Sequence, residues 1–176
     1  YSGDGFVLLQ FVLEQGLVMD VGEEMRREVF EPLGMTMTDM MWREDFAENL
    51  ADGFTVEGQS VPHDDRSKVR AAGSMDTTIS DMAKFAAALA KCEGLSEPSC
   101  AAFFAPTLPI PTATQFVNVG APLPDEPTYP DLAAGRGLVV PSGPPGNAIF
   151  NGGHNGNTGN TTDCAPSDRA CIVIRS

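Results

Sequence analysis

Apolar side chains crowd the start of the chain. Between residues 5 and 15 they are dense enough to predict a buried helix, which Gly16 can end. A second helix is predicted over residues 23–30, because its acidic residues come first and its arginines later, the order that suits the helix dipole. Pro32 and Gly34 terminate it. The first part of the chain is therefore expected to be helical.

A third apolar pattern predicts the clearest helix, which runs to Lys91. Thr78 is the candidate N-cap, and Asp81 follows three residues on, as in a capping box. The apolar residues that come next fall on one stripe of a helix: Met82, Phe85, Ala86 and Leu89.

The last third of the chain has strand-like patterns instead. Short β-like runs occur at residues 137–140, 148–150 and 171–175, separated by stretches rich in proline, glycine and asparagine. Residues 106–130 are rich in proline and predict an extended loop or a linker. Composition thus predicts a helical region over residues 1–110, a Pro-rich connection over 111–130 and a β-sheet region over 131–176.

The charge of the chain narrows the choice of partners. The 24 acidic and 11 basic side chains leave a formal net charge of −13, which repels nucleic-acid phosphates and anionic lipid. The apolar run near the start is too short to span a membrane. We therefore expect no nucleic-acid partner and no membrane span.

The start at Tyr1 and the end directly after a strand-like run are abrupt, and we expect a chain that is incomplete at both ends.

Four cysteines form two local pairs, Cys92 with Cys100 and Cys164 with Cys171. Each pair brackets turn-forming residues, which predicts two short-range disulfides and an oxidising compartment, either periplasmic or extracellular. Four reduced thiols in a cytosolic protein are the alternative. A zinc site is disfavoured because no C-x-x-C occurs and neither pair has a histidine nearby.

The chain has two histidines, so a histidine metal site or a Ser-His-Asp triad would have to use His63 or His154. His63 could ligate a metal together with Asp64 and Asp65, although a solvated charged loop is the simpler interpretation. His154 lies in the glycine-rich segment 152–159, which lacks the lysine of a phosphate cradle. That segment is either an ordinary tight turn or a strand edge whose glycines let backbone N–H groups approach a substrate, as in an oxyanion hole. We predict no metal and no cofactor.

Five segments, taken in order, resemble motifs of class C β-lactamases and their carboxypeptidase and esterase relatives. The chain begins YSGDGFVLL, which is similar to that family's Tyr-Ser-Asn-x-x-Tyr-x-Leu-Leu. It continues with EMRREVFEPLGM at residues 24–35, AAGSM at 71–75 leading to Phe85, GRGL at 135–138 and GHNG at 153–156. The family has FEPLGM, AAGGL…ST…DLARF, GYGLGW and GHTG or KTG in these places. The shared order over most of the chain carries the resemblance.

The resemblance implies an α+β fold of the β-lactamase/transpeptidase-like kind, with a helical region packed on an antiparallel sheet and the active site at their junction. It also implies a serine hydrolase that works through an acyl-enzyme. The family's Ser-x-x-Lys, which supplies the nucleophile, is missing, because the residues three positions before the lysines are Asp65, Asp81 and Ala88. The nucleophile is therefore expected upstream of Tyr1.

Roles for individual residues follow from the same resemblance. Tyr1 would relay the proton of the serine, helped by the charge of the Ser-x-x-Lys lysine, since a tyrosine at its reference pKa of about 10 is a poor base at neutral pH. His154 would replace the third-motif lysine and face the substrate carboxylate or the developing negative charge. Asn157 would lend its backbone N–H to the oxyanion hole. Asn155 and Gly156 complete this substrate-binding segment.

Gly3 departs from the family's pattern. Many relatives have an asparagine there, whose amide contacts the acylamide group of β-lactams and peptides. An esterase or a peptidase for D-amino-acid substrates therefore fits at least as well as a β-lactamase.

Three interpretations of the chain remain open. The first is part of a serine hydrolase that acts on esters, D-amino-acid peptides or β-lactams, with a small-molecule or peptidoglycan-like substrate. The second is a catalytically inactive relative that binds peptidoglycan or a protein. The third is a small, unrelated secreted protein, against which the abrupt ends count. A Ser-x-x-Lys upstream of Tyr1 would favour the first. The oligomeric state is not predicted.

Overall fold

A computed structural model describes residues 2–63, 67–110, 132–141, 149–155, 158–165 and 167–175. The chain divides into two compact units. The helical unit comprises Ser2–Phe85 and His154–Gly159, and the sheet unit comprises Ala86–Gly153 and Asn160–Ser176. One boundary between them falls inside a helix. The three regions expected from composition, 1–110, 111–130 and 131–176, are defined by amino-acid content and not by contacts. The two units therefore do not test them, and they stay a prediction.

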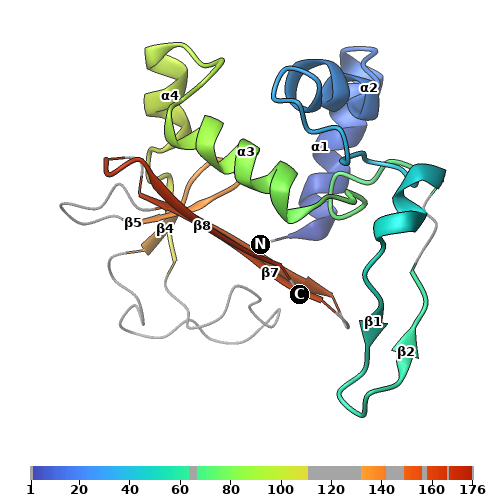
Figure 1. The fold of residues 1–176 in the computed structure, drawn as a ribbon. Helices are drawn as coiled ribbons and strands as arrows, with labels where there is room; N and C mark the ends of the chain where they lie inside the picture. Colours follow the sequence, from blue (N-terminus) through green and yellow to red (C-terminus); the bar gives the residue numbers. More distant parts are fainter. Residues whose placement is uncertain are drawn as a thin grey trace, which may run out of the picture. The chain divides into compact units, whose positions relative to one another are not determined.

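All three helices that the sequence predicts are present, two of them in the helical unit and the third divided between the two units (Figure 1). The elements of the helical unit are α1 (Gly3–Gly16), α2 (Val21–Met25), a π-helical turn (Arg26–Phe30), a 3-10 turn (Glu44–Asn49), a short hairpin of β1 (Gly53–Phe54) and β2 (Ser60–Val61), and the first part of α3 (Ile79–Ala90). Phe30, Met35, Met40, Phe46 and Met82 are its buried apolar side chains.

Local signals start and stop these helices. Ser2 is the N-cap of α1 and accepts a hydrogen bond of 3.0 Å from the Gly5 N–H. Gly34 has a φ of +64°, which an L-residue with a side chain adopts only at a cost, and it ends the π-helical turn after Pro32 as predicted. The Met35 N–H then returns to the Phe30 carbonyl at 2.8 Å.

The predicted burial of the first helix is wrong. Helix α1 has no buried residue, and Leu8 and Phe11 are 62% and 60% exposed. The reason is the way the helix is turned, because its inner face carries the polar side chain of Gln10, whose amide makes hydrogen bonds to a distant loop.

A six-stranded sheet dominates the other unit. Its strand order is β3-β4-β5-β6-β7-β8, and the strand pairs with described registers are all antiparallel. The strands are β3 (Leu108–Pro109), β4 (Leu132–Ala134), β5 (Val139–Pro141), β6 (Ile149–Asn155), β7 (Thr158–Ala165) and β8 (Ala170–Arg175). Strand β3 lies within the segment 106–130 that was expected to be a loop or linker, and residues 111–130 of that segment lie outside the described residues.

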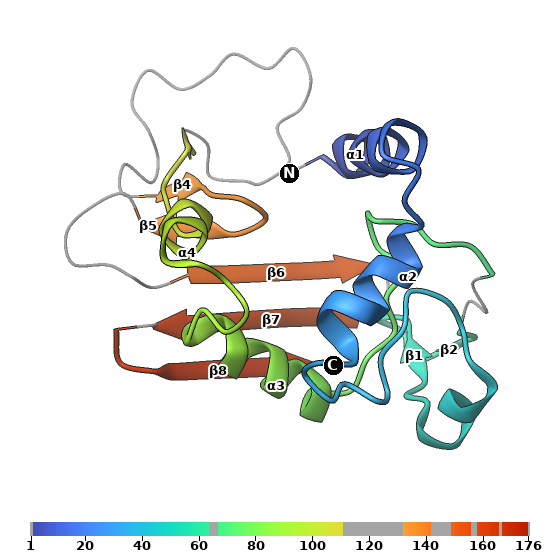
Figure 2. The ribbon, with the colours of Figure 1, turned by 90° about the horizontal axis from the view of Figure 1, so that it is seen from above.

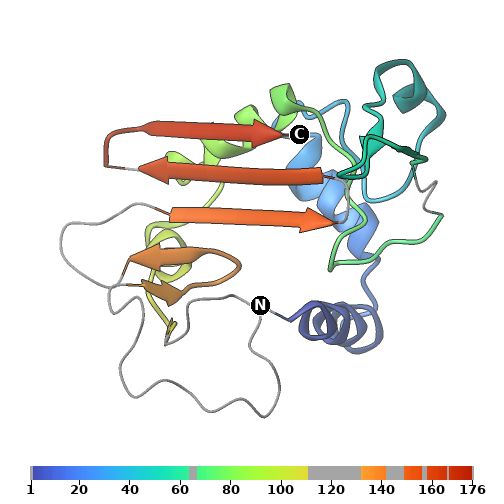
Figure 3. The ribbon, with the colours of Figure 1, turned by 90° about the horizontal axis from the view of Figure 1, so that it is seen from below.

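Helices cover one face of this sheet. Helix α4 (Glu97–Phe103) and the part of α3 from Ala86 onward lie across it (Figure 2), and Figure 3 shows the opposite face. The buried side chains that fill the space include Ala86, Leu89, Ala133, Val140 and Ile149. The fold is therefore α+β, with helices packed on an antiparallel sheet.

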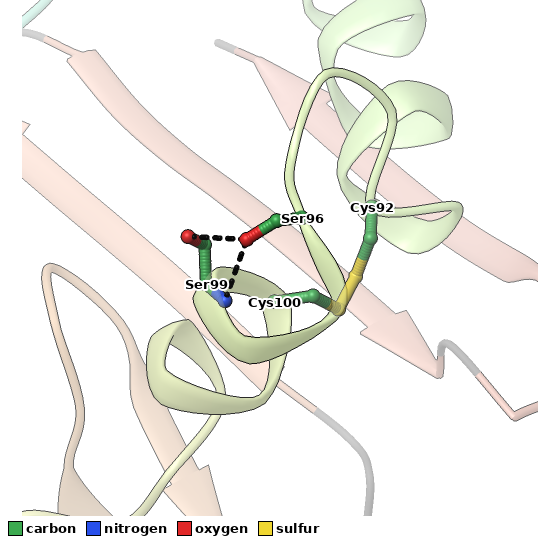
Figure 4. The surroundings of a disulfide bond; sticks show 4 residues. All are labelled: Cys92, Ser96, Ser99 and Cys100. Carbon is green, nitrogen blue, oxygen red and sulfur yellow. Dashed lines mark hydrogen bonds between the residues drawn. A yellow bond between two sulfur atoms is a disulfide. The ribbon is translucent and has the colours of Figure 1, made fainter.

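Both predicted disulfides are present. Cys92–Cys100 joins the turn after α3 to helix α4, with a Cα–Cα distance of 5.7 Å (Figure 4). Ser96 caps α4 beside this bond and accepts a hydrogen bond of 3.3 Å from the Ser99 N–H. Cys164–Cys171 links paired positions of β7 and β8 with a Cα–Cα distance of 4.1 Å.

Within the described ranges, no single helix is both long and apolar enough to cross a membrane. Helix α1 and the segment Val21–Phe30 meet the length and composition criteria only as a pair, across a bend of 99°.

Candidate functional site

The residues predicted to do chemistry are unevenly covered by the structure. Tyr1, Gly156 and Asn157 lie outside the described residues. His154 and Asn155 are described as backbone only, as the last residues of strand β6. Gly3 is half-buried and is the first residue of α1. The roles assigned to these residues stay predictions. The distances given below are those of the helices and strands on which the residues lie.

The second motif packs against the AAGSM motif. A Cβ atom placed on Gly3 would meet the Cβ atom of Ala72 at 3.8 Å, an ordinary contact distance. About two turns further along α1, the Gln10 amide donates to the Val69 carbonyl at 3.1 Å and accepts from the Ala71 N–H at 2.9 Å. Helix α1 is thus joined to the AAGSM segment by hydrogen bonds from one side chain, Gln10, to the backbone.

Gln10 is a site-building residue that the sequence did not reveal. In the sequence, the one signal that could have identified it is that it is a polar residue inside the apolar run of a predicted helix. Its partners lie 59 and 61 residues away, so no local pattern identifies them.

The buried Ser74 of the same motif has a structural role. Its Oγ donates to the Met40 carbonyl at 2.7 Å and accepts from the Arg70 N–H at 2.9 Å. It is fully buried. A hydroxyl engaged in both directions and closed off from solvent is not positioned to attack a substrate.

The segment resembling FEPLGM is tied to the same unit through ion pairs. The Arg26 Nη2 atom donates to both carboxylate oxygens of the buried Asp39, at 3.1 and 3.2 Å. Hydrogen bonds to Glu23 and then to Asp39 raise the pKa of the Arg26 guanidinium. Asp39 also forms a β-bridge with Asp76, through N–H to carbonyl bonds of 3.0 and 3.1 Å in the two directions.

His63 is anchored at the other side of this bridge. Its Nε2 atom lies 2.9 Å from the Asp76 Oδ1 atom, and its ring lies 4.7 Å from the Trp42 ring, measured between centroids. Asp64 and Asp65, its possible partners in a metal site, lie outside the described residues. The part of the chain that is described holds no cluster of three or more metal-ligating side chains.

A pocket of about 260 Å³ lies in the helical unit and contains none of the predicted site residues. Arg26 and Arg43 line it together with Phe30, Glu31, Gly34, Met35, Thr36 and Thr38. Arg26 is already paired with Glu23 and Asp39, and Arg43 with Asp45 and the Thr36 carbonyl. Both guanidinium groups that line the pocket are therefore already paired with carboxylates.

The third motif lies on a strand that continues past its neighbour. The register between β5 and β6 is described at Val139↔Phe150, and the chain before Val139 turns away at Gly135, whose N–H bonds to the Leu138 carbonyl at 2.8 Å. Strand β6 continues from there to Asn155. Within the described residues, the end of β6 therefore has a backbone edge that β5 does not pair.

Glycine allows the close packing at this end of the sheet. A Cβ atom on Gly152 would lie 3.4 Å from the Asn160 carbonyl oxygen of the neighbouring strand β7. His154–Gly159 belongs to the same compact unit as Ser2–Phe85. The end of β6 and the start of β7 are thus grouped with helix α1, although more than 100 residues separate them in sequence, whereas Gly153 and the rest of β6 belong to the sheet unit.

Solved structures of similar fold span a range of hydrolase-related proteins. An octameric penicillin-binding protein homologue from Pyrococcus abyssi superposes with a TM-score of 0.76 at 17% identity, over 100% of this chain and 38% of the other. A class C beta-lactamase gives a TM-score of 0.73 at 14% identity, over 99% of this chain and 52% of the other. A D-stereospecific amidohydrolase from Streptomyces sp. gives 0.68 at 18% identity, over 99% and 49%.

At these identities the likeness shows a shared fold, of the β-lactamase/transpeptidase-like kind. The chain spans about half the length of these solved proteins, or less. No curated protein matches it. The family model described as Beta-lactamase matches residues 1–169, nearly the whole sequence, and the chain therefore belongs to the Beta-lactamase family.

Proposed function

We propose that this chain is part of a serine hydrolase that acts through an acyl-enzyme on esters, D-amino-acid peptides or β-lactams. One observation carries the proposal: the helical unit groups the three motif-like segments that lie within Ser2–Phe85 with His154–Gly159, which contains most of the third motif. Family membership and the hydrolase fold of the similar structures support it.

In the proposed reaction the serine comes from a Ser-x-x-Lys motif that these 176 residues lack. Its Oγ attacks the acyl carbon while its proton passes to the oxygen of Tyr1. The leaving alcohol or amine takes that proton as the tetrahedral intermediate collapses to the acyl-enzyme. Water then attacks the ester, Tyr1 accepts its proton and returns it to the serine, and the acid is released.

The unpaired edge at the end of β6 would hold the substrate. Gly152 and Gly153 carry no side chain that would block a substrate from the backbone, so a carbonyl or amide can approach it closely. The N–H of Asn157 would donate to the oxyanion, and a donor at His154 would meet a carboxylate. Gly3 offers no amide for an acylamide group, which favours esters and D-peptides over β-lactams.

The experiment that tests the proposal is labelling of the protein produced from its complete reading frame with a fluorophosphonate and with a fluorescent penicillin. We expect stoichiometric labelling of one serine that lies three residues before a lysine, upstream of Tyr1. A protein that folds but reacts with neither probe would contradict the enzyme assignment.

A catalytically inactive relative is the second candidate. The absence of a Ser-x-x-Lys motif from the sequence upstream of Tyr1 would favour it. In that case the fold would serve to bind peptidoglycan or a protein, and binding to purified peptidoglycan would survive in a protein that no serine probe labels.

The two disulfides are consistent with an extracellular place. We propose a periplasmic or secreted location.

A further inference from the structure

Polar contacts of the Gln10 side chain tie helix α1 to the rest of the helical unit. Within the described ranges no residue of α1 is buried, so buried apolar side chains do not fix the helix there. The Gln10 Nε2 atom donates to the Val69 carbonyl at 3.1 Å, and its Oε1 atom accepts from the Ala71 N–H at 2.9 Å. Nε2 also donates to the Glu14 carboxylate at 2.8 Å. The amide thus uses both of its donor hydrogens and its acceptor oxygen, which defines its orientation.

The loop that receives these bonds is itself fixed by further contacts. The Arg70 N–H donates at 2.9 Å to the Oγ atom of the fully buried Ser74, and that hydroxyl donates to the Met40 carbonyl at 2.7 Å. Val69 packs tightly against the start of α2, where a Cβ atom placed on Gly22 would lie 2.8 Å from the Val69 Cγ2 atom. The loop is therefore a fixed support for the helix that is tied to it.

This tie fixes the beginning of α1 as well as its middle. An α-helix is stiff and rises about 1.5 Å per residue, so a rotation or a slide of α1 at Gln10 is transmitted to its first residue, Gly3. A Cβ atom placed on Gly3 would lie 3.8 Å from the Ala72 Cβ atom of the same loop. Ser2 is the N-cap of the helix, and Tyr1 precedes it in the chain. Two attachments to one loop, about two turns apart, thus set the point from which the chain leads to Tyr1.

We propose that Gln10 is a positioning residue for Tyr1. The inference rests on the proposed function, in which Tyr1 takes the proton of the nucleophilic serine. In this role Gln10 touches no reacting atom, and its bonds hold the helix so that the Tyr1 oxygen is within hydrogen-bond reach of the serine. A misplacement of about 1 Å costs up to about 100-fold in rate. Loss of the tie therefore acts on the chemical step and not on substrate binding.

The test compares Gln10→Met with Gln15→Met in the protein produced from its complete reading frame. Methionine is similar to glutamine in length and helix propensity, but it cannot donate a hydrogen bond and its sulfur is a weak acceptor. Gln15 is exposed on the same helix and is the matched control. We expect Gln10→Met to lower kcat and the rate of fluorophosphonate labelling by about 10- to 100-fold, with KM within about twofold of wild type. Gln15→Met should leave all three unchanged.

A double-mutant cycle with Tyr1→Phe gives a readout that a merely structural role would not move. Gln10→Met should lower the labelling rate by less than about twofold in a protein that already carries Tyr1→Phe, because no hydroxyl is left to misplace. A residue that only stabilises the fold would lower the rate by the same factor in both backgrounds. Equal factors would therefore overturn the proposal, and so would wild-type kcat in the folded Gln10→Met protein.

A second variant covers the case in which Gln10→Met does not fold. Gln10→Glu keeps the length of the side chain and an acceptor for the Ala71 N–H, but its carboxylate cannot donate to the Val69 carbonyl. It should also lower kcat with little change in KM, and an unchanged kcat in the folded Gln10→Glu protein would reject the positioning role.

The positioning role and the proposed function fail in different ways. If no serine of the wild-type protein is labelled, the proposed function is wrong and the role of Gln10 falls with it. If a serine is labelled and Tyr1→Phe lowers kcat, but both Gln10 variants react at the wild-type rate, the proposed function stands and only the positioning role is rejected.

Discussion

The carboxylate of Asp81 accepts a hydrogen bond of 2.7 Å from the backbone N–H of Met37, which lies 44 residues earlier in the chain. The same buried carboxylate accepts from the Thr38 hydroxyl at 3.0 Å and pairs with Lys84 at 2.8 Å. Lys84 in turn donates to the Gly34 carbonyl. The start of α3 is thereby fastened to the turn that follows the FEPLGM-like segment.

Asp81→Ala should destabilise the protein by about 3 kcal/mol, because it removes the acceptor of the partly buried Met37 N–H, the carboxylate partner of the buried Thr38 hydroxyl and the ion pair with Lys84. Urea unfolding at neutral pH measures this. Asp45→Ala is the matched control, since Asp45 is exposed and paired only with Arg43 at the surface, and it should change the stability little. Equal effects of the two substitutions would contradict the structural role of Asp81.

The same carboxylate should make stability depend on pH. Burial raises the pKa of the Asp81 carboxyl, but the hydrogen bonds from its partners outweigh burial and hold that pKa below the ordinary value of 3.8. A folded-state pKa below the unfolded-state value means that the stabilisation is complete above the unfolded-state pKa and is lost as pH falls through the folded-state pKa. The stability difference between wild type and Asp81→Asn should be constant from about pH 5 to 7 and shrink below about pH 4. A difference that stays unchanged in acid would show that the charge of Asp81 does not matter.

The two disulfides should differ in their resistance to reduction. Cys92 and Cys100 are both partly exposed, whereas Cys164 is buried and its sulfur and that of Cys171 lie 3.8 and 3.3 Å from the Ala86 carbonyl oxygen. A thiolate must reach a sulfur to open the bond, so mild reduction of the native protein should open Cys92–Cys100 first. Alkylation at timed intervals, followed by peptide mapping, measures the order in which the two bonds are reduced, and the difference between them should vanish in denaturant.

Loss of either disulfide should lower the free energy of unfolding by about 2–3 kcal/mol by the loop-closure estimate.

Tyr1→Phe in the complete protein should lower kcat by about 10²–10⁴-fold, the usual worth of general-base assistance. Phenylalanine removes only the hydroxyl, so a change in packing does not account for the loss. Steady-state kinetics with one ester and one D-Ala-D-Ala peptide measure it. Near-wild-type kcat in a folded Tyr1→Phe protein would reject the catalytic role.

His154→Ala should raise KM more than it lowers kcat. A donor to a substrate carboxylate binds the ground state and the transition state alike, so its loss weakens binding uniformly. The effect should appear with a substrate that carries a carboxylate and be small with a neutral ester. The same loss of kcat on both substrates would place His154 in the chemical step instead.

Residues 1–176 produced alone should hydrolyse neither nitrophenyl esters nor a chromogenic β-lactam, because they lack the Ser-x-x-Lys motif that would supply the nucleophile. Turnover together with stoichiometric labelling of one of their own serines would refute the roles assigned to Tyr1 and His154.

The sequence by itself determined the features that depend on neighbouring residues. The Asp81 N–H bonds to the Thr78 hydroxyl at 3.2 Å, as the predicted cap requires, and α3 runs from Ile79 to Ala90. The cysteine pairs and the strand at residues 171–175 were also predicted. The candidate site came from the order of its motifs, which is likewise written in the sequence. Caps, apolar stripes and short loops act over a few positions, so their pattern is visible without the fold.

Only the tertiary structure decided which way side chains turn and which strands pair. The Asp81 carboxylate, expected to complete a capping box, goes to Met37 and Thr38 instead. Strand β7 has a polar sequence and becomes a strand because β8 on one side, and β6 on the other, offer backbone partners. Gln10 turns the apolar face of α1 outward because its partners come from a loop 59 and 61 residues away. Such contacts form between residues that the chain brings together only on folding, and no local pattern contains them.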